Sequence, residues 1–157
     1  MQVVKEICNK IAVMENGHVV EEGDLLSIFT EPKEKITKEF INTATHVEQA
    51  LENILKHPTL LDLQSNDILA SISYVGESTS DPLIATLTTR FGVTTNILFG
   101  NVEILQETPV GNLIVVLSGE LNLRDKAIAY LKSKNVKVTL IHHHQQIIPL
   151  KKKTNII

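Results

Sequence analysis

The most regular alternation of hydrophobic and polar positions begins at residue 67. Apolar positions recur every second residue over 68–75, which is the period of a half-buried strand that Gly76 ends. Asp81-Pro82 then supply a cap and a first-turn proline for a helix with an apolar stripe over 83–91. Gly92 follows this helix in the place of a C-terminal cap. The pattern therefore predicts a strand and then a helix.

A second extended stretch covers residues 93–106. Val93, Thr95, Ile97 and Phe99 share one face at odd positions, whereas the apolar positions shift to Val102 and Ile104 beyond Gly100. Because a shift of one residue reverses the faces of a strand, we expect a bulge or bend at Gly100. The elements expected after it are a turn at 108–112, an apolar strand at 113–117, a helix at 121–135 and a last strand from residue 136.

The predicted order in residues 67–148 is β-α-β-β-α-β. Right-handed crossovers place both helices on one face of a four-stranded antiparallel sheet. The expected fold class is therefore α+β, as a ferredoxin-like, ACT-like sandwich with strand order 4-1-3-2. In that order the second strand, residues 93–106, is an edge of the sheet.

Residues 1–41 form an N-terminal extension with helical and hairpin patterns but with too few apolar positions for a core of their own. Asn-Gly between two apolar runs is a strong hairpin signal, because both turn residues must accept positive φ. The expected elements are a helix over residues 3–11, a hairpin at Asn16-Gly17, a helix over 25–29 capped by Asp24, and a short turn capped by Thr37 that ends near 40–41.

Residues 42–66 are predicted to be a helical linker. Thr45-x-x-Glu48 has the spacing of a capping box, and an apolar stripe follows at helical spacing. His57-Pro58 is expected to end this helix. At the other end of the chain, residues 149–157 are expected to be a solvated basic tail.

Composition excludes several classes of protein. The chain has 157 residues, of which 43% are hydrophobic and 21% charged, as in a globular protein of about one domain. A net charge of −3 and an aromatic content of 4% argue against a nucleic-acid partner. The longest purely apolar run, residues 113–117, is far shorter than the ~20 residues that span a bilayer. The N-terminus carries charges where a signal peptide is apolar.

Few residue patterns indicate chemistry. The sequence contains neither G-x-x-x-x-G-K-[ST] nor G-x-G-x-x-G, so no phosphate-binding loop is visible. His142-His143-His144 stand in a strand, where neighbours point to opposite faces and cannot converge on one metal ion. Cys8 has no partner for an internal disulfide, which suits a reducing compartment, and it is expected to be a small buried hydrophobe. No catalytic or metal-binding residue is predicted.

The most informative segment is the middle of the edge strand, Thr95, Asn96, Ile97 and Leu98. An edge leaves backbone N–H and C=O groups unpaired, and the Asn96 amide both donates and accepts. Such an edge can pair with the same edge of a second copy, or hold the ammonium and carboxylate of a free amino acid. An ordinary solvated polar edge is the alternative.

Residues 67–142 resemble the NIL domain, the ferredoxin-like C-terminal module of methionine-type ABC importers. The Asn-Ile-Leu of its name stands here as Asn96-Ile97-Leu98. Other matching stretches are Asp81-Pro82-Leu83, Arg90-Phe91-Gly92-Val93, Pro109-x-Gly111, Ala127-Ile128-x-x-Leu131 and Val136-Lys137-Val138.

Residues 1–41 resemble the last segment of the ATPase domain of the same importers. The matching stretches are Val3-Val4-Lys5-Glu6-Ile7-Cys8, Ala12-Val13-Met14-Glu15-Asn16-Gly17, Ile28-Phe29 with Pro32, and Phe40-Ile41. The resemblance implies that the nucleotide-binding motifs stand upstream, so this chain is expected to be a C-terminal fragment that does not hydrolyse ATP. ATP and Mg²⁺ are implied for the parent translocase, which would join a membrane permease subunit at the cytoplasmic face of the cell membrane.

The NIL resemblance implies a regulatory function. In that family free methionine binds near the interface of two such domains and holds the transporter inactive. Of the ligand contacts, the resemblance places one on Asn96, with its neighbours Thr95, Ile97 and Leu98 as further candidates. Two alternatives stay open: an ACT-like sensor of another amino acid, and a module that only dimerises through its edge strands, without a ligand.

Overall fold

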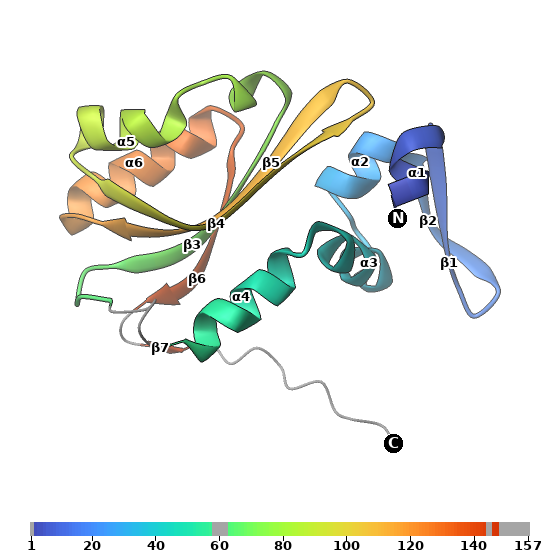
Figure 1. The fold of residues 1–157 in the computed structure, drawn as a ribbon, viewed down its shortest axis with the longest axis horizontal. Helices are drawn as coiled ribbons and strands as arrows, with labels where there is room; N and C mark the ends of the chain where they lie inside the picture. Colours follow the sequence, from blue (N-terminus) through green and yellow to red (C-terminus); the bar gives the residue numbers. More distant parts are fainter. Residues whose placement is uncertain (1, 58–62, 144–145, 148–157) are drawn as a thin grey trace.

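The strands of the C-terminal half form one five-stranded antiparallel sheet in the computed structural model, which describes residues 2–57, 63–143 and 146–147 (Figure 1). The strand order is β4-β5-β3-β6-β7. The first four strands follow the predicted order 4-1-3-2, and β7 adds a two-residue pairing outside β6. The predicted α+β, ferredoxin-like arrangement is confirmed, with β4 at an edge. The strands are β3 (Ile68–Val75), β4 (Thr94–Leu105), β5 (Thr108–Ser118), β6 (Lys137–His143) and β7 (Gln146–Ile147).

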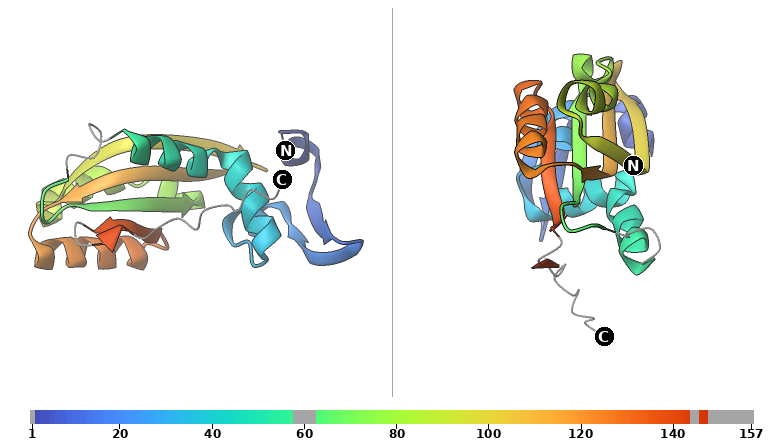
Figure 2. Two further views of the ribbon diagram at one scale, coloured as in Figure 1. Left: turned by 90° about the horizontal axis from the view of Figure 1, so that it is seen from below. Right: turned by 90° about the vertical axis from the view of Figure 1, so that its left-hand side faces the viewer.

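Helices α5 (Leu83–Phe91) and α6 (Leu121–Ser133) cover one face of this sheet (Figures 1 and 2). Their apolar stripes meet alternate residues of the strands, and Gly92 ends α5 with φ 66°, as its position predicted. We call this side the α5/α6 face. Its core contains Ile68, Ala70, Ile72, Leu83, Leu87, Val93, Leu113, Val115, Leu117, Ala127, Leu131 and Val136.

Helix α4 (Val47–Lys56) lies against the opposite face of the sheet, which we call the α4 face (Figure 2). Ile54 of α4 packs there with Leu69, Ile114 and Val116, all of them buried. The expectation that β3 is half-buried is therefore wrong at its first residues, where Leu69 is 0% exposed. The reason is tertiary, because a helix from a preceding segment shields the face that alternation assigns to solvent.

The N-terminal residues form a small unit beside the sheet (Figure 1). The Asn16-Gly17 hairpin is confirmed, with φ values of 50° and 81°. Asp24 caps α2 as predicted, since its carboxylate accepts a hydrogen bond from the Ser27 backbone N–H at 2.9 Å. The helix predicted over residues 3–11 is shorter, because Ile11 already belongs to a strand. The elements are α1 (Gln2–Ile7), β1 (Lys10–Glu15), β2 (His18–Asp24) and α2 (Leu25–Thr30).

The turn from α3 (Lys35–Thr45) to α4 differs from the prediction. Thr37 does not cap a helix, because it is buried inside α3, which runs through the predicted boundary between residues 41 and 42. Thr45 does not form a capping box, because it ends α3 and its hydroxyl donates to the Ile41 carbonyl at 3.0 Å. His46, with φ 58°, forms the junction instead. The helix-ending prediction at His57 is confirmed, while Pro58 lies outside the described residues.

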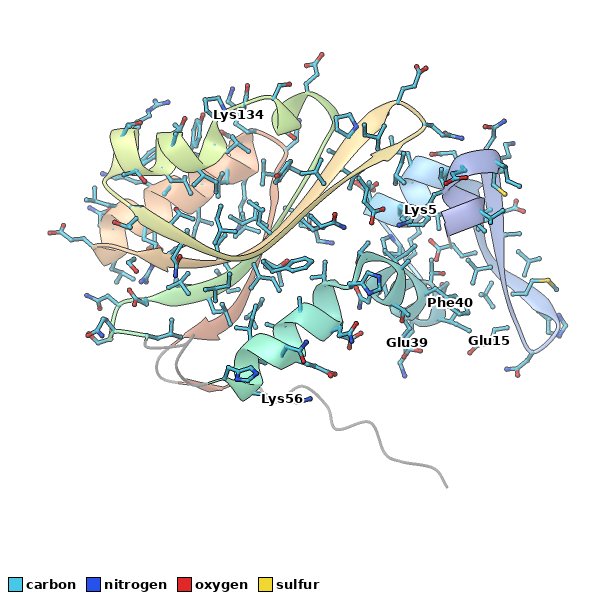
Figure 3. The ribbon with its side chains drawn as sticks, viewed as in Figure 1. Lys5, Glu15, Glu39, Phe40, Lys56 and Lys134 are labelled. Carbon is cyan, nitrogen blue, oxygen red and sulfur yellow. The ribbon has the colours of Figure 1, made fainter. Side chains whose placement is uncertain are left out.

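A shared hydrophobic cluster joins the N-terminal unit to the sheet. Leu105 and Val110, from the hairpin of β4 and β5, are buried against Leu25 and Phe29 of α2 and Ile41 of α3. Beside them Lys5 of α1 forms an ion pair with Glu103 of β4. Figure 3 shows Lys5 between α1 and the end of this hairpin. The edge strand of the sheet therefore also contributes to the core of the N-terminal unit.

Two details of the β4–β5 hairpin differ from the sequence-based expectation. The bulge lies at Leu98, between Ile97 opposite Val115 and Phe99 opposite Ile114, and not at Gly100. The turn lies at Gln106-Glu107, whose φ values are 48° and 68°, and not at 108–112, which belong to β5. The second correction lengthens both strands, because the turn takes two residues instead of five.

Candidate functional site

The predicted site residues lie on β4, which is hydrogen-bonded to β5 on one side and is the last strand of the sheet on the other. Within the described ranges, its outer edge therefore carries backbone N–H and C=O groups that no neighbouring strand pairs. Asn96 stands opposite Val116 of β5, two residues before the bulge at Leu98.

The alternation of side chains along β4 decides which of the four predicted residues share a face. Thr95 and Ile97 stand opposite Leu117 and Val115, so they lie on the α5/α6 face. Asn96 and Leu98 lie on the α4 face, where Leu98 packs against the cluster around Ile54. Side chains on opposite faces cannot converge on one small ligand. The geometry therefore brings together Asn96 and Leu98 as one pair, and Thr95 and Ile97 as another.

The four side chains also differ in accessibility. Asn96 is exposed, and Ile97 is 48% exposed although it is apolar. Leu98 is half-buried. The Thr95 hydroxyl oxygen is buried and has no hydrogen-bond partner among the described residues. A buried hydroxyl without a hydrogen-bond partner destabilises the fold. A donor or acceptor brought to the Thr95 hydroxyl by a ligand or a second chain would therefore be stabilising.

The second half of β4 carries polar groups that the sequence pattern did not single out. The Glu103 carboxylate accepts a hydrogen bond from Asn101 Nδ2 at 3.0 Å and pairs with Lys5. Its pairing opposite Val110 places it on the α4 face, which Asn96 shares. No local signal could have found the contact with Lys5, because the two residues are 98 positions apart.

A family model for the NIL domain matches residues 68–140. The match starts at the first residue of β3 and ends inside β6, so it includes the whole edge strand. Residues 68–140 form a NIL domain. The resemblance that Asn96-Ile97-Leu98 indicated is thereby confirmed.

Curated relatives match nearly the whole chain, including the unit that precedes the NIL domain. The methionine import ATP-binding protein MetN 1 of Enterococcus faecalis is 56% identical over 146 residues, 93% of this chain and 41% of the relative. MetN of Lacticaseibacillus paracasei is 47% identical over 138 residues, 88% of this chain and 39% of the relative. MetN of Streptococcus thermophilus is 50% identical over 141 residues, again 39% of the relative. The chain spans about two fifths of the length of these relatives.

One solved structure is also similar. It is the crystal structure of the C-terminal domain of an ABC transporter ATP-binding protein from Enterococcus faecalis, with a TM-score of 0.46 and 24% sequence identity. The similarity covers 59% of this chain and 94% of that chain. In the described part of the present chain, no helix is both long enough and apolar enough to cross a membrane.

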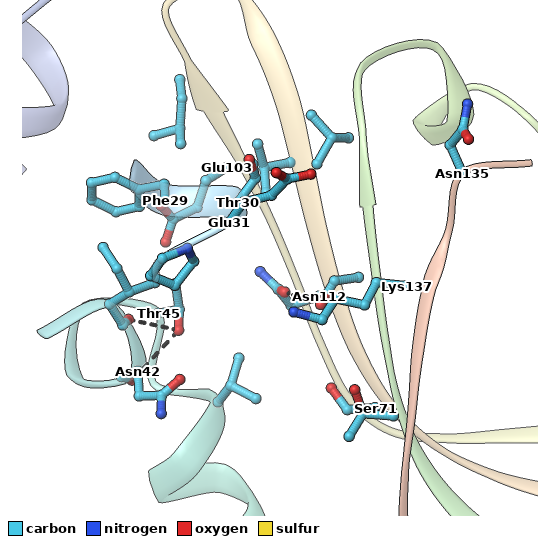
Figure 4. A pocket seen from close by; sticks show the side chains of 18 residues that line it. Phe29, Thr30, Glu31, Asn42, Thr45, Ser71, Glu103, Asn112, Asn135 and Lys137 are labelled. Carbon is cyan, nitrogen blue, oxygen red and sulfur yellow. Dashed lines mark hydrogen bonds between the residues drawn. The ribbon is translucent and has the colours of Figure 1, made fainter. Parts of the chain in front are cut away.

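A cleft of about 440 Å³ lies between the NIL sheet and helices α2 and α3 (Figure 4). Its sheet wall is polar: the Ser73 hydroxyl donates to Asn112 Oδ1 at 2.8 Å, and Ser71, Lys137 and Thr139 line the same wall. The opposite wall includes Phe29 and other residues of α2, α3 and the segment between them. None of the four predicted site residues lines this cleft.

A smaller cavity of about 160 Å³ lies on the α5/α6 face of the NIL domain, between β3, β5 and the start of α5. Tyr74 closes one side, and burial raises the pKa of its hydroxyl above the ordinary value. Gly111 is required beneath it, because a Cβ atom at that position would lie 2.2 Å from the Tyr74 ring. This cavity, like the cleft, contains none of the four predicted residues.

The sequence also offered His142-His143-His144 and Cys8 as candidates. No group of three or more His, Cys, Asp or Glu residues is placed to hold a metal ion in the described part of the chain. Of the three adjacent histidines, His144 lies outside the described residues, as does the predicted basic tail. Cys8 is a free thiol that is half-exposed, not buried as expected.

Proposed function

We propose that this chain is part of the ATP-binding subunit of a methionine importer, and that its NIL domain binds free methionine at the edge strand β4 to inhibit uptake. The observation that carries the proposal is the position of Asn96. It is an exposed amide on an unpaired strand edge, inside a NIL domain, in a chain similar to methionine import ATP-binding proteins over 93% of its length.

The edge offers the polar groups that an amino acid needs. The Asn96 amide accepts a hydrogen bond from an ammonium through its oxygen and donates to a carboxylate through its nitrogen. Unpaired backbone groups of β4 add further donors and acceptors along the same line. Leu98, on the same face as Asn96, supplies apolar surface for a thioether side chain.

Inhibition requires that methionine distinguish two arrangements of the transporter. A ligand with equal affinity for both would shift no population, however tightly it binds. The structure supports a route from the site, because β4 carries Asn96 near one end and contacts α1 and α2 through Glu103 and Leu105 near the other. Methionine that favours one position of β4 would thereby favour one position of the N-terminal unit.

The remaining assignments concern the longer protein. We assign residues 1–41 to the end of an ATPase domain, 42–66 to a linker, 67–148 to the NIL domain and 149–157 to a basic tail. We assign ATP and Mg²⁺ to the parent ATP-binding subunit and not to this chain, because its sequence has no phosphate-binding loop. The whole subunit would act as a translocase with a membrane permease at the cytoplasmic face of the cell membrane.

Calorimetric titration of the chain with a panel of free amino acids tests the ligand. We expect heat of binding with L-methionine, and weaker or no binding with leucine, isoleucine, glutamine and serine. The apolar surface that Leu98 offers beside Asn96 suits an unbranched apolar side chain better than a branched or polar one. Tighter binding of another amino acid would replace methionine as the ligand. If no amino acid of the panel binds, the domain is a dimerisation module without a ligand.

We also propose that two chains associate through β4, because its edge has neither proline nor lysine to prevent pairing. Ile97→Lys is expected to shift sedimentation at tens of micromolar from dimer to monomer, since a charge replaces a 48% exposed apolar side chain at the edge. Leu121→Lys is the matched control, because Leu121 is 59% exposed but lies on α6. A monomeric unsubstituted chain, or equal effects of both substitutions, would contradict association through β4.

A further inference from the structure

A row of polar side chains crosses the sheet on the α4 face, along the sheet wall of the cleft of about 440 Å³. Ser73 of β3 stands opposite Lys137 of β6 on one side and opposite Asn112 of β5 on the other. Ser71 and Thr139 form a second pair of opposite residues next to this row. Helix α4 packs against an apolar part of the same face, so the polar side chains gather where the cleft leaves the sheet accessible.

Hydrogen bonding within this row leaves mainly donors for a ligand. The Ser73 hydroxyl donates to Asn112 Oδ1 at 2.8 Å, which occupies the amide oxygen and leaves the two N–H donors of Nδ2. The Lys137 side chain reaches from β6 toward Asn112 in Figure 4. Among the described residues, neither Asn112 Nδ2 nor the Lys137 ammonium has a hydrogen-bond or ion-pair partner. A cation beside free N–H donors suits an oxyanion.

The other charged groups of the cleft limit the charge of that anion. Glu103 lines the cleft, but its carboxylate is paired with Lys5 and accepts a hydrogen bond from Asn101. Glu31 lines the opposite wall, is exposed, and forms no ion pair with any described residue. A doubly charged anion would therefore meet an unpaired carboxylate without a second cation to offset it. The cleft thus favours an anion with one negative charge.

The wall opposite the row is largely apolar. Phe29 of α2, Ile41 of α3 and Pro32 between these helices line it, as Figure 4 shows for Phe29. A volume of about 440 Å³ is within the range of sites for small organic molecules, which are mostly apolar with a few polar groups that orient the ligand. The cleft has this combination, because its donors lie on one wall and its apolar side chains on the other.

We propose that this cleft is a second ligand site, which binds a small monocarboxylic acid with an apolar body. Lys137 and Asn112 hold the carboxylate, and the apolar body lies toward Phe29 and Ile41. The site is separate from the methionine site proposed above, because none of the four β4 residues lines the cleft. Its ligand would contact both the sheet and helices α2 and α3, so binding would favour one position of the N-terminal unit against the NIL domain.

Nuclear magnetic resonance titration of the whole chain tests the ligand class with probes that share one butyl group. Pentanoate is expected to shift backbone amide signals saturably on both walls, in residues 71–73 and 137–139 and in residues 29–32. Butyl phosphate, whose phosphate group carries about two negative charges near neutral pH, should bind more weakly. Butylamine, a cation, should cause no saturable shift at these residues.

A pair of lysine substitutions tests the assigned residue. Lys137→Met removes the charge and keeps an unbranched side chain, and it is expected to weaken pentanoate binding at least about tenfold, the usual effect of losing one charge-assisted hydrogen bond. Lys126→Met is the matched control, because Lys126 is also exposed but lies on α6, which covers the other face of the sheet. It should leave the affinity unchanged. Both lysines are exposed, so neither substitution should prevent folding.

A third variant tests the donor of the row. Asn112→Asp keeps the oxygen that accepts from Ser73 but replaces the two N–H donors by a charged acceptor. It is expected to abolish saturable binding of pentanoate, because two carboxylates would then meet. Pentanoate affinity equal to that of the unsubstituted chain would remove Asn112 from the site.

The remaining outcomes separate the cleft from the methionine site. Asn96→Ala should leave pentanoate affinity unchanged, and Lys137→Met should leave methionine affinity unchanged. No saturable shift with pentanoate, tighter binding of butyl phosphate, or equal affinities of Lys137→Met and Lys126→Met would overturn the cleft proposal alone. Methionine binding that Lys137→Met removes and Asn96→Ala preserves would overturn both proposals, because the cleft would then be the methionine site.

Discussion

Asn96→Ala is expected to weaken methionine binding by about 1–3 kcal/mol, or about 5- to 150-fold in affinity. The substitution removes an amide that would both accept from the ammonium and donate to the carboxylate of the ligand, and it leaves those ligand groups without partners. Because Asn96 is exposed and β4 keeps its pairing with β5, the free energy of unfolding should change by less than about 1 kcal/mol. Calorimetric affinity and thermal melting measure the two effects separately.

Asn122→Ala is the matched control, because Asn122 is also exposed but lies on α6. It should change neither affinity nor melting temperature. In the intact transporter, Asn96→Ala should also relieve inhibition by internal methionine without changing ATP hydrolysis. If Asn96→Ala binds methionine with unchanged affinity, Asn96 contributes to strand pairing and not to ligand binding. If the variant has no melting transition, Asn96 is required for folding.

Leu105→Ala is expected to reduce the free energy of unfolding by about 2–5 kcal/mol. Leu105 is 1% exposed and joins the NIL hairpin to Leu25 and Phe29 of α2. Its truncation removes a large apolar side chain and leaves a cavity between the N-terminal unit and the sheet. Urea unfolding, followed by circular dichroism, measures the loss, and Leu121→Ala, at a position 59% exposed, should change stability by no more than about 0.5 kcal/mol.

Hydrogen exchange distinguishes where Leu105→Ala acts. Because Leu105 packs between the sheet and the N-terminal unit, protection from hydrogen exchange should fall first in β1, β2 and α2. Helices α5 and α6 should keep their protection. This variant should also weaken any effect of methionine on the N-terminal unit, because β4 reaches that unit through Leu105 and Glu103. Equal loss of protection in α6 and in α2 would show one cooperative core instead of two joined ones.

Local sequence signals predicted the elements whose conformation depends on neighbours in the chain. Asn16-Gly17 was sufficient for a hairpin because few other residue pairs accept two positive φ values, and Gly92 ended α5 for the same reason. The strand order of the sheet followed from the element order and the handedness of crossovers. The NIL resemblance of residues 67–142 also came from short stretches of sequence.

Contacts between distant segments were not predictable in this way. Nothing near Leu69 indicated that α4 would bury it, and the charged Arg124 stood at a position that helical spacing did not mark as core. Arg124 is 1% exposed, and its guanidinium donates to the Asn66 carbonyl just before β3. Burial of such side chains depends on which elements pack together, and local periodicity does not contain that information.

In the candidate site, too, the sequence predicted some features and the tertiary structure decided others. By itself the sequence determined that Asn96 lies on an edge strand, because alternation and element order place that strand last in the sheet. Only the tertiary structure decided the face of each side chain, because pairing with β5 puts the bulge at Leu98 and not at Gly100. This shift of the bulge by two positions places Phe99 on the opposite face from Ile97, because a residue beyond a bulge changes sides.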